Sequence, residues 1–183
     1  MNTIGYRTKN PLLRILAMVA IGMAFLFACG MGQRGSAPPP ELSVDVLLTG
    51  TQGIDSHQEA SAEWIASREE LEQLLAGQNA SQMPAQDLKP AIEVDFALSS
   101  ILLVRMGRKP TAGYSLNLAP DSCSISQETA YISLVWIEPA PGMVAAQVIT
   151  SPFILLKLSK GGYDAVNVVD QHKKTLFDLP VAD

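Results

Sequence analysis

The side chains that could carry out acid–base or metal chemistry are few and scattered. His57 follows Asp55 and Ser56, a combination that a hydrolase triad could use, but no nucleophile motif of the G-x-S-x-G type occurs in the chain. His172 and Cys123 share no zinc-ligand spacing with His57. No glycine-rich phosphate loop is present either. We therefore expect a protein that is not an enzyme, with no metal and no cofactor.

Composition narrows the class further. The 183 residues include 13 basic and 18 acidic side chains, a formal charge of −5. An acidic chain is poorly suited to nucleic acid, which requires a basic surface to neutralise phosphates. Two cysteines are too few for a disulfide scaffold. The length allows one domain with extensions.

The N-terminal segment has the layout of a secretory signal peptide. Arg7, Lys9 and Arg14 form a basic region, and residues 15–28 are almost all apolar. This apolar run of fourteen residues is shorter than the roughly 20 that a membrane-spanning helix needs. A retained membrane anchor is the alternative interpretation.

The sequence Leu26-Phe27-Ala28-Cys29 resembles the lipobox of bacterial lipoproteins. The resemblance implies cleavage after Ala28 and lipidation of Cys29 with a diacylglyceryl group and a fatty acyl chain such as palmitate, which would anchor an exported domain to the cell envelope. Gly30 stands where these proteins often carry Asp when they stay at the inner membrane. In a Gram-negative host this favours the outer membrane.

Three parts of the chain are therefore expected: a lipoprotein signal peptide (1–28), a lipidated Gly- and Pro-rich tether (29–41), and a single β-rich domain (42–183). Short connections after the helix predict consecutive antiparallel strands. The expected fold is α+β, an antiparallel sheet or small sandwich of about six to seven strands with one short helix.

The clearest element is a helix over residues 67–76. Ser67 and Glu70 form a capping box, three leucines share one face, and Gly77 follows the last turn. Residues 78–90 contain two prolines and are expected to form a loop. Residues 64–65 are expected to form either a strand that leads into this helix or a hydrophobic staple at its start. Alternation and apolar runs predict strands over residues 44–48, 101–106, 114–118, 131–137, 144–150, 153–158, 163–169 and 175–177.

The segment 107–114 stands out because it is both rigid and basic. Gly107 and Gly113 allow unusual backbone angles, Pro110 fixes one, and Tyr114 offers an apolar ring with a polar tip. One interpretation is a well-built hairpin turn. The other is a loop presented to a partner.

Four sequence blocks resemble the C-terminal domain of the PrcB family: Val94-Asp95-Phe96, residues 107–115, residues 139–142 and residues 147–153. The similarity covers about residues 94–160. The family is named for a lipoprotein subunit of a bacterial protease complex and is not enzymatic. The resemblance therefore implies an accessory or stabilising subunit that binds another protein, such as a surface protease.

The segment 110–114 is also similar to a loop of chagasin-type protease inhibitors, which gives an inhibitor as one alternative function. A structural envelope lipoprotein with no specific ligand is the other. In the leading hypothesis, the loop 107–114 and the turn 150–153 bind the partner. A structural interpretation is that residues 150–152 form the turn that places the next strand beside this loop; the two blocks would then form one patch in which Tyr114 and Phe153 pack on each other. The predicted partner-binding residues are Gly107, Arg108, Pro110, Thr111, Gly113, Tyr114, Thr150, Ser151, Pro152 and Phe153.

Overall fold

The computed structural model describes residues 41–52, 57–76, 85–119 and 123–181. Contacts divide the chain between residues 37 and 38, and every described residue belongs to the second part. The predicted signal peptide, Cys29, nearly all of the tether and Gly77 lie outside the described residues. Within the described part, no helix is long and apolar enough to cross a membrane.

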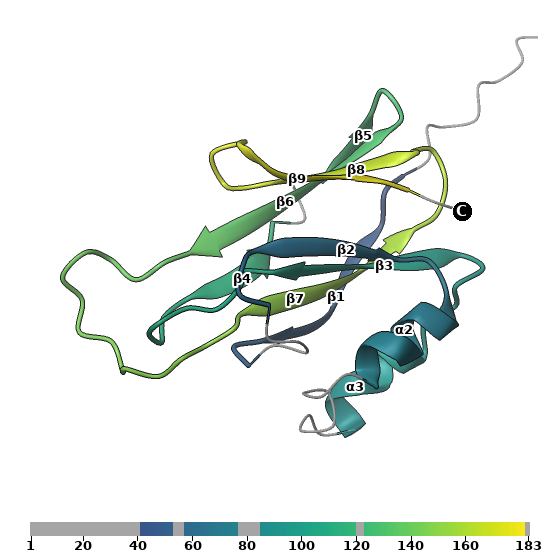
Figure 1. The fold of residues 1–183 in the computed structure, drawn as a ribbon. Coiled ribbons are helices and arrows are strands. Elements are labelled where there is room, and N and C mark those ends of the chain that lie inside the picture. The colour runs from purple at the N-terminus through teal and green to yellow at the C-terminus, as the bar shows by residue number, and fades with distance from the viewer. Residues whose placement is uncertain (1–40, 53–56, 77–84, 120–122, 182–183) are drawn as a thin grey trace, which may run out of the picture. The chain divides into compact units, whose positions relative to one another are not determined.

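The described strands form two sheets (Figure 1). The first sheet has the order β1-β7-β3-β2 and is antiparallel throughout. Its strands are β1 (Val44–Gly50), β2 (Ser61–Ile65), β3 (Ser99–Arg105) and β7 (Phe153–Ser159). The second sheet has the order β4-β6-β8-β9, with β5 also paired to β6. Its strands are β4 (Ser115–Leu118), β5 (Ser124–Ser126), β6 (Thr129–Ile137), β8 (Ala165–Val169) and β9 (Thr175–Pro180).

The described part has three layers, the helices, the first sheet and the second sheet, with an apolar core between each neighbouring pair. Apolar side chains from β3 and β7 meet those of β4, β6 and β8 between the sheets. On its other face the first sheet packs against the helices α2 (Arg68–Leu75) and α3 (Ala85–Ile92), as Figure 1 shows. The predicted β-rich α+β sandwich is therefore confirmed, with two helices and nine strands in the described part of the chain.

The central strands explain the most apolar runs of the sequence. Leu102 and Val104 of β3 face the second sheet, whereas Ile101 and Leu103 face the helices. β7 is covered on both faces in the same way. A strand with two covered faces needs apolar side chains at every position, which is why these strands read as continuous apolar runs.

Helix α2 begins as its sequence predicts. Ser67 is the N-cap, and its hydroxyl accepts a hydrogen bond from the Glu70 N–H at 3.2 Å. The Glu70 carboxylate accepts in return from the Ser67 N–H at 3.3 Å, which completes the capping box. Leu71 is buried against the first sheet, so the predicted helix over 67–76 is confirmed at its start and along its apolar face.

Part of the predicted loop over residues 78–90 is wrong. Residues 85–92 form α3 with Pro90 inside it. Proline lacks an N–H and disfavours a helix interior, but Leu88 and Ala91 of this helix are buried, and the buried apolar area outweighs the lost bond. Pro84 lies outside the described residues.

The connections also differ from expectation at two places. The predicted strand over 144–150 is wrong: the segment leaves the second sheet after Ile137 and reaches the first at Phe153, so it joins neither ladder beyond one isolated bridge. β8 pairs parallel to β6, because β7 lies between them in sequence but in the other sheet. The short strand β5 was not expected.

Candidate protein-binding surface

Two segments that connect the sheets lie side by side. The motif loop (residues 107–114) joins β3 to β4, and the crossover arm (residues 138–152) joins β6 to β7. In Figure 1 the arm is the long green connection on the left. The Lys109 N–H donates to the Thr150 carbonyl at 2.8 Å, and the Thr150 N–H donates to the Lys109 carbonyl at 3.0 Å. The two segments are thus fastened by a reciprocal backbone pair.

Two further hydrogen bonds fix the ends of this pairing. The Met106 N–H donates to the Pro152 carbonyl at 2.9 Å. The Thr150 hydroxyl donates to the Thr111 carbonyl at 3.1 Å, and Thr150 is only 5% exposed. The structure therefore brings the two predicted sequence blocks together.

Gly107 sets the direction of the motif loop. Its φ of +73° lies in the left-handed region, and a Cβ placed there would be 2.5 Å from the carbonyl carbon of Glu59. The next residue, Arg108, donates its N–H to the Gln58 carbonyl at 3.2 Å. Only glycine allows both the backbone angle and this close passage.

The ten predicted partner-binding residues separate by exposure. Those that are buried hold the two segments in place, and those that are exposed form part of the surface. The buried residues are Gly107, Thr150, Pro152 and Phe153; the half-buried ones are Thr111, Tyr114 and Ser151; the exposed ones are Arg108, Pro110 and Gly113. A role of these residues in partner binding stays a prediction.

Tyr114 and Phe153 do not pack on each other. Tyr114 packs against the core between the two sheets. Phe153 lies in the core on the helix side of the first sheet, where its ring leaves no room for a Cβ at Gly50, the nearest ring carbon being 2.6 Å away. The expected contact between them is wrong because the two side chains belong to cores on opposite faces of the first sheet.

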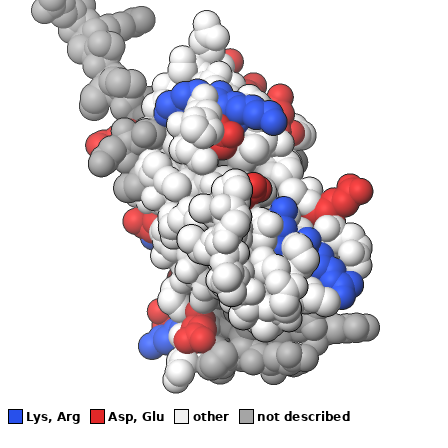
Figure 2. All heavy atoms as spheres, turned by 90° about the vertical axis from the view of Figure 1, so that its left-hand side faces the viewer, with Lys and Arg blue, Asp and Glu red and all other residues white. Residues whose placement is uncertain are grey.

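The crossover arm adds an apolar surface that sequence reasoning missed. Val144 is 99% exposed and Met143 63%, and both Val148 and Ile149 are about half exposed (51% and 50%). Figure 2, which faces this end of the fold, shows a broad uncharged area with groups of charged side chains at its margins. The available signal was the absence of any charged residue between Glu138 and Lys157.

The basic residues near the motif loop have different roles. Arg105 is buried, and its guanidinium donates to the Glu63 carboxylate at 2.9 Å. Arg108 is exposed. The Lys109 ammonium lies 5.3 Å from the centre of the Tyr114 ring, a cation–π arrangement. Two of the three cations therefore remain at the surface beside the uncharged part of the arm, residues 139–152.

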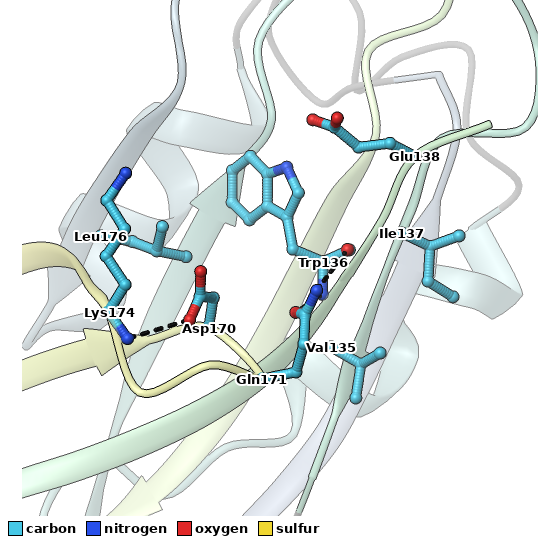
Figure 3. Close-up of a pocket in the computed structure, with 8 residues that line it drawn as sticks. All are labelled: Val135, Trp136, Ile137, Glu138, Asp170, Gln171, Lys174 and Leu176. Carbon is cyan, nitrogen blue, oxygen red and sulfur yellow. Dashed lines mark hydrogen bonds between the residues drawn. The ribbon is translucent and has the colours of Figure 1, made fainter. Parts of the chain in front are cut away.

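A separate hollow of about 580 Å³ lies where β8 and β9 part from β6 (Figure 3). The Gln171 amide accepts from the Trp136 N–H at 2.9 Å and donates to the Trp136 carbonyl at 3.2 Å, so it pairs with this edge as a strand would. The Asp170 carboxylate accepts from the Lys174 and His172 N–H groups, which lowers its pKa. Both polar side chains thus serve the turn and the sheet edge.

The candidate chemical residues do not assemble into a site in the described part. No group of three potential metal ligands occurs there. His57 and His172 are exposed, and Asp55 and Ser56 lie outside the described residues. Cys123 is half-buried, and burial raises the pKa of its thiol.

The fold and this surface define a two-sheet β-sandwich with a helical cover and an exposed apolar crossover. Residues 100–159 match the family described as PrcB C-terminal, so the resemblance seen in the sequence motifs is confirmed over this segment. The match runs from β3 to β7 and includes both the motif loop and the crossover arm. No curated protein and no solved structure is significantly similar to the chain.

Proposed function

We propose that the chain is an exported lipoprotein, anchored to the cell envelope through Cys29, whose sandwich binds another protein without catalysing a reaction. The partner is a surface protease, and the chain serves as its accessory or stabilising subunit. The lipobox-like segment supports the anchor. The family described as PrcB C-terminal supports association with a protease complex.

The observation that carries this proposal is the exposed arm held against the motif loop. Four of the eight large apolar side chains that are exposed in the described part come from the arm: Met143, Val144, Val148 and Ile149. Single exposed apolar residues are ordinary, but a gathered set indicates an interaction site. Backbone hydrogen bonds from the motif loop to Ala146 and Thr150 hold the arm on both sides of Val148 and Ile149, so binding would order few residues there.

The same geometry favours a docking subunit over an inhibitor. A loop that enters a protease cleft needs to project with its backbone free. Here the Lys109 backbone is paired with the arm, and the Thr111 carbonyl accepts from the Thr150 hydroxyl. The apolar arm also distinguishes the chain from an envelope protein without a ligand, which gains nothing from exposing it.

The test is co-purification from detergent-solubilised envelopes with the tagged full-length chain. Val144→Asp places a charge on the arm, and Leu98→Asp does the same at an exposed position at the opposite end of β3. We expect a protease to co-purify with the unmodified chain and Leu98→Asp, and to be at least tenfold depleted with Val144→Asp. Thermal unfolding midpoints should agree within a few degrees. Equal recovery from both variants, or no protease with any, would contradict the proposed function.

The anchor is tested separately. Cys29→Ser removes the thiol that would carry the lipid, so we expect the variant to lose the acyl chains and most of its association with the membrane. Membrane fractionation and intact-mass measurement check both effects. If the Cys29→Ser variant exceeded the mass of its cleaved polypeptide by as much as the unmodified chain does, the result would argue against lipidation at this residue.

A further inference from the structure

The backbone of the crossover arm is largely unpaired. The Ala112 N–H donates to the Ala146 carbonyl at 3.0 Å, and Thr150 pairs with Lys109. By contrast, Ala145 and Gln147 have neither an N–H nor a carbonyl partner within the described part of the chain. Unpaired backbone groups of this kind are the feature that lets an edge accept another strand.

The unpaired groups of Ala145 and Gln147 point away from the motif loop. In an extended chain, alternate residues direct their backbone groups to opposite edges. The Ala146 carbonyl accepts from the Ala112 N–H of the motif loop, so the neighbouring residues Ala145 and Gln147 direct their groups away from that loop. One turn interrupts the extension, since the Val148 N–H donates to the Ala146 carbonyl at 2.8 Å. Gln147, at its centre, has no positive φ, so this is an inverse γ-turn, a type whose central residue has a φ of about −75°.

The side chains indicate what would pair there. The arm carries no charge between Glu138 and Lys157, and its exposed valines and isoleucine favour extended structure. Arg108 and Lys109 flank it, and neither is in a salt bridge with another described residue. An extended polypeptide with apolar side chains and acidic residues at one end complements these features. A helix or a lipid surface cannot offer the backbone groups that Ala145 and Gln147 lack.

We infer that the crossover arm is an acceptor edge: a segment of the partner adds to it as a β-strand, hydrogen-bonding Ala145 and Gln147, with acidic residues toward Arg108 and Lys109. Main-chain hydrogen bonds supply affinity in this mode of recognition, and the side chains supply selectivity. The inference rests on the proposed function, because it names how the partner would bind the same surface.

The probe is a synthetic octapeptide with three threonine–valine repeats followed by two aspartates, added to the full chain in detergent. We expect slower amide hydrogen exchange at Ala145 and Gln147 on binding. A matched peptide ending in two lysines should bind at least tenfold more weakly. No binding, or binding without protection of these two amides, would overturn the inference.

Proline variants test the backbone directly. Gln147→Pro removes an unpaired N–H, and the inverse γ-turn already has a φ that suits proline. Gln147→Ala is its control, and Ala145→Pro with Ala145→Ser forms a second pair. Each proline should weaken binding of the aspartate peptide about tenfold, while the controls bind as the unmodified chain does. Equal binding by proline and control variants would overturn the inference.

Two outcomes separate this inference from the function on which it rests. A protease that co-purifies equally with Gln147→Pro and Gln147→Ala, but is lost with Val144→Asp, would leave the proposed function standing and overturn strand addition. Sedimentation of the full chain as a dimer that Gln147→Pro dissociates would assign the edge to a second copy and overturn the partner named here.

Discussion

At the scale of single residues, the motif separates into positions that build the surface and positions that lie on it. Gly107, Thr150 and Phe153 are buried, and each is held by a specific neighbour: the backbone near Glu59, the Thr111 carbonyl and Gly50. Arg108 and the four exposed apolar side chains of the arm face solvent. Substitutions at the first kind of position should therefore change stability, and those at the second should change binding.

Gly107→Ala tests this division. The added Cβ would meet the backbone at Glu59, in a loop whose φ is already left-handed, so we expect a loss of about 3 kcal/mol in the free energy of unfolding. Gly142→Ala is the matched control, since Gly142 has a φ of +83° with nothing within 4 Å. It should lose only about 1 kcal/mol from the backbone angle. Urea unfolding measures both. Equal losses would mean that the close passage at Glu59 is not what restricts this position.

At the scale of elements, the sequence predicts an element correctly where the contacts that form it join residues close together in the chain. The capping box of α2 involves residues three apart, so the sequence contains all of it. The predicted strand over 144–150 in the arm is wrong because a strand and an unpaired extended segment share one side-chain pattern. What distinguishes them is whether a neighbouring strand is present, which here depends on the jump between sheets after Ile137.

The same reason limits prediction of the candidate site. The sequence blocks around Gly107 and Thr150 could be grouped because they resemble one family, and the structure places them together. The core to which Tyr114 or Phe153 belongs depends on how the layers stack, which alternation alone does not show. Helix α3 was missed since Pro90 is a strong local signal against it, whereas the burial that stabilises it involves distant strands.

Ser67→Ala tests the stability contributed by an element end. The variant removes the hydroxyl that accepts from the Glu70 N–H at 3.2 Å, so we expect a loss of about 1 kcal/mol in the free energy of unfolding. Glu70→Gln keeps the capacity to accept from the Ser67 N–H and should lose less. Urea unfolding with both variants checks the order. A larger loss for Glu70→Gln would contradict the assignment of the Ser67 hydroxyl as the main cap.

At the scale of the whole described part, the layers leave one end for binding. The helices cover one face of the first sheet, and the second sheet covers the other. Both connections between the sheets that include the family motifs, the motif loop and the crossover arm, lie together, and the arm's apolar side chains remain uncovered. The buried residues of the motif thus hold an apolar edge at the surface, and in the proposed function a protein partner covers it.

The most direct measurement is site-specific photo-crosslinking in cells that produce the full-length chain. A benzophenone amino acid replaces Val144 in one strain and Leu98 in another, since both positions are highly exposed. We expect a cross-link from position 144 to a protease, identified by mass spectrometry, and none to that protein from position 98. Identical products from both positions, or no protein product from position 144, would contradict the claim that this arm is a protein-binding surface.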